Sequence, residues 1–91
     1  MKYLICYDIQ EDKVRTKVFK LLKSCARRVQ YSVFLGDFTD REAKALRQKL
    51  LSLTEESEQK MLMMAPLCKT CSAMIWKIGE YIDEPGCCIV A

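Results

Sequence analysis

The segment RRVQYSVFLGDF, residues 27–38, decides the fold, because it alternates like a strand yet carries unusual residues on its polar side. A half-buried strand requires such an alternation. One side comprises Val29, Tyr31, Val33 and Leu35. The other side comprises Arg28, Gln30, Ser32 and Phe34. We expect residues 28–39 to be extended, as one bent strand or as a tight hairpin in which Gly36 relieves the backbone.

The polar side of this segment holds groups that bind phosphate. Arg28 offers a planar, permanently charged guanidinium. Gln30 and Ser32 can hydrogen-bond phosphate oxygens or a metal-bound water. A solvent-facing side is the alternative, and the large apolar ring of Phe34 argues against it.

The preceding segments indicate a strand followed by a helix. Residues 2–9, KYLICYDI, are rich in strand-forming residues, and both faces look apolar, which predicts a central strand. Residues 12–26 show the apolar spacing of one buried helix stripe. The stripe comprises Val14, Val18, Leu21, Leu22 and Cys25.

The following segments add a second helix and further strands. Thr39 and Glu42 form the sequence signature of a capping box, and apolar residues at helical spacing follow it. Those residues are Ala43, Leu46, Leu50 and Leu53. Residues 60–65 read as a strand stopped by Pro66, and residues 67–79 include a short helical stretch.

This order predicts an α+β fold, a ferredoxin-like βαββαβ sandwich with an extra C-terminal strand. We assign residues 1–82 to the domain and residues 83–91 to a tail strand that adds to the sheet of a partner protomer. A frayed terminus is the alternative for the tail.

Length and composition favour a small intracellular protein. A chain of 91 residues is one domain near the lower size limit for a self-sufficient core, so a homodimer is expected. No apolar run approaches the roughly 20 residues of a membrane span, and no signal-peptide pattern is present. We therefore expect a cytoplasmic protein without a membrane partner.

Cysteines and the absence of histidine limit the chemistry. The chain has 6 cysteines and no histidine, which removes the usual general base. In a cytoplasmic chain the cysteines are expected to be thiols. The CxxC pair, Cys68 and Cys71, is interpreted as a structural turn, with a metal site or a redox pair as alternatives.

Charge is distributed unevenly although the net charge is only +3. Between Lys13 and Gly36 the chain has basic residues and no acidic one, which predicts an anionic polymer as partner. A solvated helix face is the alternative. The basic residues are Lys13, Arg15, Lys17, Lys20, Lys23, Arg27 and Arg28.

Asp8 ends the predicted central strand and is the candidate metal ligand. A carboxylate next to buried surface needs a partner or a metal to remain ionised. An aspartate that caps the following loop or helix is the alternative.

Three motifs together resemble the CRISPR-associated protein two family, a small nuclease-like subunit of spacer acquisition. They are YDI, DKVRTKV with the following LL, and RVQYSVFLGDF. PLCKTC at 66–71 and DEPGCCIV at 83–90 are also similar to later landmarks of that family. The resemblance implies a ferredoxin-like protomer in a homodimer with face-to-face sheets, in which residues 27–38 line the dimer cleft.

The resemblance also implies site residues. The family's metal-binding aspartate corresponds to Asp8, so two copies would hold one Mg²⁺ or Mn²⁺, ions that prefer oxygen ligands. Lys17 replaces an arginine that some members carry, and it lacks bidentate geometry. The implied catalytic residues are Asp8, Tyr7, Arg15, Arg28, Ser32 and Phe34.

Two functions follow from the resemblance. One is a metal-dependent endonuclease that cleaves RNA or double-stranded DNA. The other is a catalytically silent adaptor dimer that holds duplex DNA together with the spacer integrase. Outside the family, a ferredoxin-like regulatory domain for a small ligand is a third hypothesis, which the one-sided charge disfavours.

Overall fold

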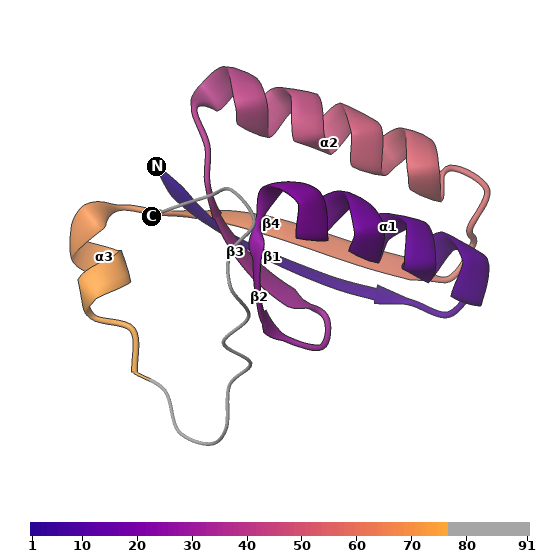
Figure 1. Cartoon of the computed structure of the whole chain (residues 1–91), viewed down its shortest axis with the longest axis horizontal. Coiled ribbons are helices and arrows are strands. Elements are labelled where there is room, and N and C mark those ends of the chain that lie inside the picture. Colours follow the sequence, from indigo (N-terminus) through magenta and orange to yellow (C-terminus); the bar gives the residue numbers. More distant parts are fainter. Residues whose placement is uncertain (77–91) are drawn as a thin grey trace.

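The structure is a computed structural model, and it describes residues 1–76 of the chain. The expected tail strand, 83–91, and the end of the 1–82 domain lie outside the described residues. Two helices cover one face of a four-stranded sheet, and a third short helix follows the last strand (Figure 1). The elements are β1 (Lys2–Ile9), α1 (Asp12–Cys25), β2 (Arg27–Gln30), β3 (Val33–Asp37), α2 (Asp40–Thr54), β4 (Lys60–Leu67) and α3 (Lys69–Ala73).

The sheet has the strand order β2-β3-β1-β4, and every neighbouring pair is antiparallel. This order with helices on one face is the ferredoxin-like βαββαβ arrangement, so the predicted fold class is confirmed. β1 is central, as predicted, between β3 and β4. None of the helices within residues 1–76 is both long and apolar enough to cross a membrane.

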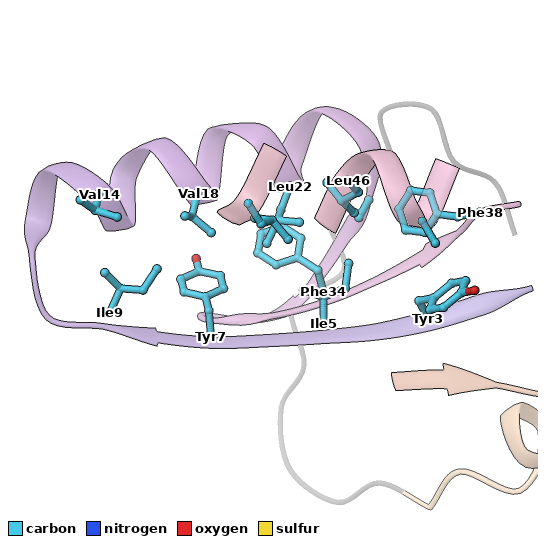
Figure 2. Packing of buried hydrophobic residues seen from close by; sticks show 13 residues of the cluster. Tyr3, Ile5, Tyr7, Ile9, Val14, Val18, Leu22, Phe34, Phe38 and Leu46 are labelled. Carbon is cyan, nitrogen blue, oxygen red and sulfur yellow. The ribbon is translucent and has the colours of Figure 1, made fainter. Parts of the chain in front are cut away.

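The core lies between the sheet and the two long helices. β1 contributes every second residue to it, and Val18 and Leu22 of α1 pack from the other side (Figure 2). Val18, Leu22 and Ile5 are fully buried. The β1 residues in the core are Tyr3, Ile5, Tyr7 and Ile9.

The second helix begins at the predicted capping box. The Glu42 amide donates to the Thr39 hydroxyl at 3.1 Å, and the Thr39 amide donates to the Glu42 carboxylate at 2.9 Å. Both bonds satisfy amide groups that have no partner within the helix. This prediction is confirmed.

Residues 27–38 form a hairpin, with the turn at Tyr31 and Ser32 rather than at Gly36. Arg28 pairs with Phe34 across the two strands, so both side chains lie on the same face of the sheet. Phe34 is fully buried in the core, which makes this the helix-covered face (Figure 2). The expectation that Phe34 lines a cleft is therefore wrong.

The last described strand also differs from the prediction. β4 does not stop at Pro66 but continues through it to Leu67, with Pro66 opposite Tyr3 of β1. A proline is tolerated here because β4 is an edge strand, and a missing amide on its outer side removes no ladder bond.

Phe34 tests the corrected hairpin. Its ring lies 6.2 Å from the Tyr7 ring and 6.1 Å from the Phe19 ring, measured between centroids. We predict that Phe34→Leu lowers the free energy of unfolding by roughly 1–2 kcal/mol, because buried contacts are lost. The free energy of unfolding is measured by urea titration, with circular dichroism as the signal.

Leu51→Ala is the control, because Leu51 is 61% exposed on α2 and its truncation is expected to change stability by at most about 0.5 kcal/mol. A Phe34→Leu protein as stable as the wild type would contradict the core position of this ring.

Candidate functional site

A pocket of about 460 Å³ lies where β1 ends, between the first half of α1 and the turn of the β2–β3 hairpin. It brings together five of the six catalytic residues implied by the resemblance, and Phe34 is the exception because it packs in the core. The lining residues are Tyr7, Asp8, Ile9, Gln10, Arg15, Thr16, Phe19, Arg28, Tyr31 and Ser32.

Asp8 is exposed, whereas its neighbours Tyr7 and Ile9 are buried. Side chains alternate along a strand, so Asp8 points to the sheet face that the helices leave open. Its carboxylate is therefore exposed in the single chain, next to the buried residues Tyr7 and Ile9 of the same pocket. Within residues 1–76 no three aspartate, glutamate or cysteine side chains gather as a metal site. Asp8 is the one carboxylate among the described residues that line this pocket.

Arg15 joins α1 to the end of β1. Its Nη1 donates to the Ile9 carbonyl at 3.1 Å, and its Nη2 forms an ion pair with Asp12. The side chain remains 46% exposed, so the guanidinium is held in place while part of it faces solvent. A fixed cation at the pocket rim is suited to contact a phosphate.

Arg28 reaches the pocket from β2 and is half-buried. Its guanidinium carbon lies 5.0 Å from the centre of the Phe19 ring and 5.8 Å from the centre of the Tyr31 ring. Both distances are in the range of cation–π contacts. The charge therefore has a defined position next to Tyr7 and Arg15.

Tyr7 carries the only phenol of the pocket that is buried. Burial raises the pKa of this hydroxyl, while the charges of Arg28 and Arg15 lower the same pKa and offset part of the rise. Because an unperturbed tyrosine already has a pKa near 10, Tyr7 is protonated at neutral pH. A protonated phenol can donate a hydrogen bond and is not available as a base.

The hairpin turn is tied to β1 at the pocket. The Tyr7 amide donates to the Ser32 carbonyl at 3.1 Å, which places Ser32 at the rim. Gln30 does not line the pocket, and its side-chain oxygen accepts from the Tyr31 amide at 3.1 Å. The predicted phosphate-binding role thus has support for Arg28 and Ser32 but not for Gln30.

The basic residues of α1 form an exposed face of their own. Of the seven basic residues predicted to bind nucleic acid, only Arg28 is not exposed. Arg15 and Arg28 line the pocket, and the lysines do not. We call the exposed residues Lys13, Lys17, Lys20, Lys23 and Arg27 the basic face.

The pattern of the sequence did not reveal the aromatic part of the pocket. Phe19 and Tyr31 were not predicted as site residues, and Tyr31 was assigned to the inward side of a strand. Phe19 follows Arg15 by four residues, so helical spacing places them on the same face of α1. That spacing is the sequence signal that Phe19 belongs to the site. The side chain of Tyr31 reaches the pocket only because the hairpin turn falls at this residue.

The CxxC pair forms the start of α3. The Cys71 amide donates to the Cys68 sulfur at 3.2 Å, which is a helix cap and fits the structural turn that we predicted. The hydrogen bonds from Cys71 lower the pKa of the Cys68 thiol. Both cysteines are free thiols and are exposed. Metal and redox roles of this pair stay hypotheses.

Comparison with known proteins identifies the family. Residues 1–75 match the sequence profile of the family "CRISPR associated protein Cas2". A CRISPR-associated endoribonuclease Cas2 from Desulforudis audaxviator is 45% identical over 69 residues, which are 75% of this chain and 64% of that protein. Another, from Chloroflexus aurantiacus, is 41% identical over 80 residues, 88% of this chain and 86% of its own length.

Solved structures agree with this assignment. A hypothetical protein from Thermus thermophilus superposes with a TM-score of 0.75 at 30% identity, covering 91% of this chain and 96% of its own. Streptococcus pyogenes Cas2 superposes with a TM-score of 0.73 at 25% identity, covering 87% of this chain and all of its own. The matched residues include the whole pocket at the end of β1, and the chain belongs to the Cas2 family.

Proposed function

We propose that two copies of this chain form a metal-dependent endonuclease of a CRISPR system, with RNA as the first substrate to test. The observation that supports the proposal is the pocket at the end of β1, whose lining includes a carboxylate, two arginines and a protonated phenol. The relatives' names, which say endoribonuclease, support RNA over DNA.

The donor set fits a shared Mg²⁺ or Mn²⁺ ion. Asp8 is an exposed oxygen ligand, which is the type that these ions prefer. One described chain offers too few ligands for a metal centre, so a second Asp8 from a partner copy would complete the pair. When bound, such an ion supplies charge stabilisation and a water of lowered pKa.

The other pocket residues have roles that follow from their surroundings. Arg15 and Arg28 bind the phosphate, because both are permanently charged and held in place by neighbouring groups. Tyr7 donates a hydrogen bond to a phosphate oxygen, since its raised pKa keeps it protonated. Ser32 donates from the turn at the other side of the pocket.

The open face of the sheet supports the dimer. Leu4 lies beside Leu35 and Ala65, while Cys6 lies beside Val33 and Met63, so this face is apolar. Met63 is 49% exposed in the single chain. An antiparallel sheet whose second face is solvated usually has polar residues there, so an apolar face favours a partner.

Face-to-face contact of two such sheets would also bring their Asp8 residues to the same interface, since Asp8 lies on this face. The tail strand predicted at residues 83–91 remains a proposal in the same dimer.

Asp8 tests the metal assignment. We predict that Asp8→Asn lowers Mg²⁺-dependent cleavage of an RNA oligonucleotide by at least about 100-fold, because the loss of metal binding removes several kcal/mol of charge stabilisation. Cleavage is measured at a series of Mg²⁺ concentrations, with EDTA as the baseline. Circular dichroism confirms that the variant is folded.

Asp40→Asn is the matched control, because Asp40 is an exposed aspartate at the start of α2, outside the pocket. Equal cleavage by wild type and Asp8→Asn would overturn the metal assignment, and a DNA substrate in the same assay tests the substrate preference.

Met63 tests the dimer. We predict that Met63→Lys shifts the protein to monomer and removes metal-dependent cleavage together, because a charge on the apolar face opposes burial. Sedimentation velocity gives the oligomeric state. Leu51→Lys is the control, since Leu51 is an exposed apolar residue on α2, away from the open face. A monomeric wild-type protein that still cleaves would contradict the shared site.

The basic face supports a second function, that of an adaptor holding duplex DNA together with the spacer integrase. Its lysines lie outside the pocket, so they suit a long anionic polymer better than a single phosphate. Contacts to phosphates alone are insensitive to base sequence and depend strongly on salt. This function needs no catalysis, so an Asp8→Asn protein would retain it.

Lys20 and Lys23 test the basic face. We predict that Lys20→Gln with Lys23→Gln weakens duplex DNA binding for all sequences, and that the slope of log affinity against log salt becomes less steep by about 2. Fluorescence anisotropy at several salt concentrations measures both. The control is Lys44→Gln with Lys49→Gln on α2, which removes the same charge. An unchanged salt slope in the Lys20 and Lys23 double variant would contradict the role of the basic face in DNA binding. An equal loss of affinity in the two double variants would contradict it as well.

A further inference from the structure

Tyr31 stands out on the surface beside the pocket. It sits in the turn between β2 and β3 and is 77% exposed, although it lines the same pocket as Asp8 and Arg28. Such a large exposed ring at a candidate site is a feature of binding surfaces. None of the roles described above uses this ring.

Two contacts restrict the position of Tyr31, one at its backbone amide and one at its ring. The Tyr31 amide donates to the Gln30 side chain at 3.1 Å, which fixes the turn. Arg28 lies with its guanidinium carbon 5.8 Å from the ring centre, and the same group packs on Phe19 at 5.0 Å. Arg28 therefore lies within cation–π range of both the Phe19 ring and the exposed Tyr31 ring.

We propose that Tyr31 is the platform on which one unpaired nucleobase stacks while the adjacent phosphate contacts Arg28. The inference rests on the proposed nucleic-acid function and adds to it a residue that contacts a base. Stacking on an aromatic side chain needs a free base face, and a base inside a duplex has both faces covered. Because every base has such a face, this contact tolerates any sequence.

The size of the site is consistent with one nucleotide. The pocket volume of about 460 Å³ lies within the roughly 300–1,000 Å³ of small-molecule sites. The same pocket is lined by Arg15 and Arg28, which would contact the phosphate, and by Tyr31, on which the base would stack. Stacking sets where the chain of nucleotides lies, so Tyr31 is a positioning residue and not a catalytic one.

The experiment measures binding without cleavage. Fluorescence anisotropy in EDTA gives affinities for a single-stranded RNA, for the same strand with abasic nucleotides, and for a duplex. The wild type is expected to bind the complete strand more tightly than the abasic one. Tyr31→Ala should bind the complete strand about tenfold more weakly and lose the difference between the two strands, since one stacked base is removed. Its affinity for the duplex should be unchanged.

Tyr31→Phe is the matched variant, because it keeps the ring without the hydroxyl, and it should restore the wild-type affinities. Leu51→Ala, an exposed apolar truncation on α2, should change none of them.

The outcomes separate this inference from the proposed function. A wild type that binds no nucleic acid in EDTA overturns the stacking role, and one that in addition cleaves no RNA with Mg²⁺ overturns both. A wild type that binds and cleaves, with Tyr31→Ala equal to it on the complete and abasic strands, overturns the stacking role alone. A Tyr31→Ala protein that is monomeric in sedimentation and has a lower affinity for all three nucleic acids also overturns the stacking role. That result would assign the ring to a contact between two copies of the chain.

Discussion

The burial of every second residue of β1 is the constraint on which the structure depends. Tyr3, Ile5 and Tyr7 fill the space beneath α1 and α2, and this fixes which way the whole strand faces. A shift of the register by one residue would expose these rings and bury the Asp8 carboxylate, which is costly in an apolar environment. The position of Asp8 on the open face is thus a consequence of core packing.

The same constraint leaves an apolar sheet face that neither α1 nor α2 covers. A chain of this size buries a modest fraction of its surface, and two helices are enough to cover one side of the sheet only. Leu4, Cys6 and Leu35 therefore remain half-buried at best. Burial is also what raises the pKa of the Cys6 thiol, which keeps it protonated and apolar at neutral pH. The apolar residues of this face favour contact with a second copy of the chain over exposure to water.

Much of the fold followed from periodicity, because the relevant signals are local. The stripe of α1 and the capping box at Thr39 each depend on residues within a few positions of one another, and both predictions were confirmed. The hairpin turn differs from the prediction because Tyr31 and Ser32 include no glycine, proline, asparagine or aspartate, and the alternation continues across them. Phe34 shares a face with Arg28, as the alternation predicts, but that face is the one that the helices cover.

The candidate site was predicted less well than the fold, and the difference has a physical cause. The resemblance supplied Asp8, Tyr7 and the two arginines, whereas the aromatic residues were missed. Phe19 and Tyr31 reach the pocket from two elements that meet only in the folded chain, and Arg28 links them through contacts that no spacing in the sequence encodes. In particular, Tyr31 lies beside the pocket only because the turn of the hairpin falls at this residue.

The location of the pocket at the end of β1 follows from the same alternation. Tyr7 and Asp8 are neighbours in the sequence, yet they point to opposite faces of the sheet. In the middle of a strand the sheet would separate them, so no small ligand could contact both. At the strand end the neighbouring strand β3 has already turned back at Ser32, and the pocket extends around the edge of the sheet. A site that uses two adjacent residues of one strand therefore has to lie where that strand leaves the sheet.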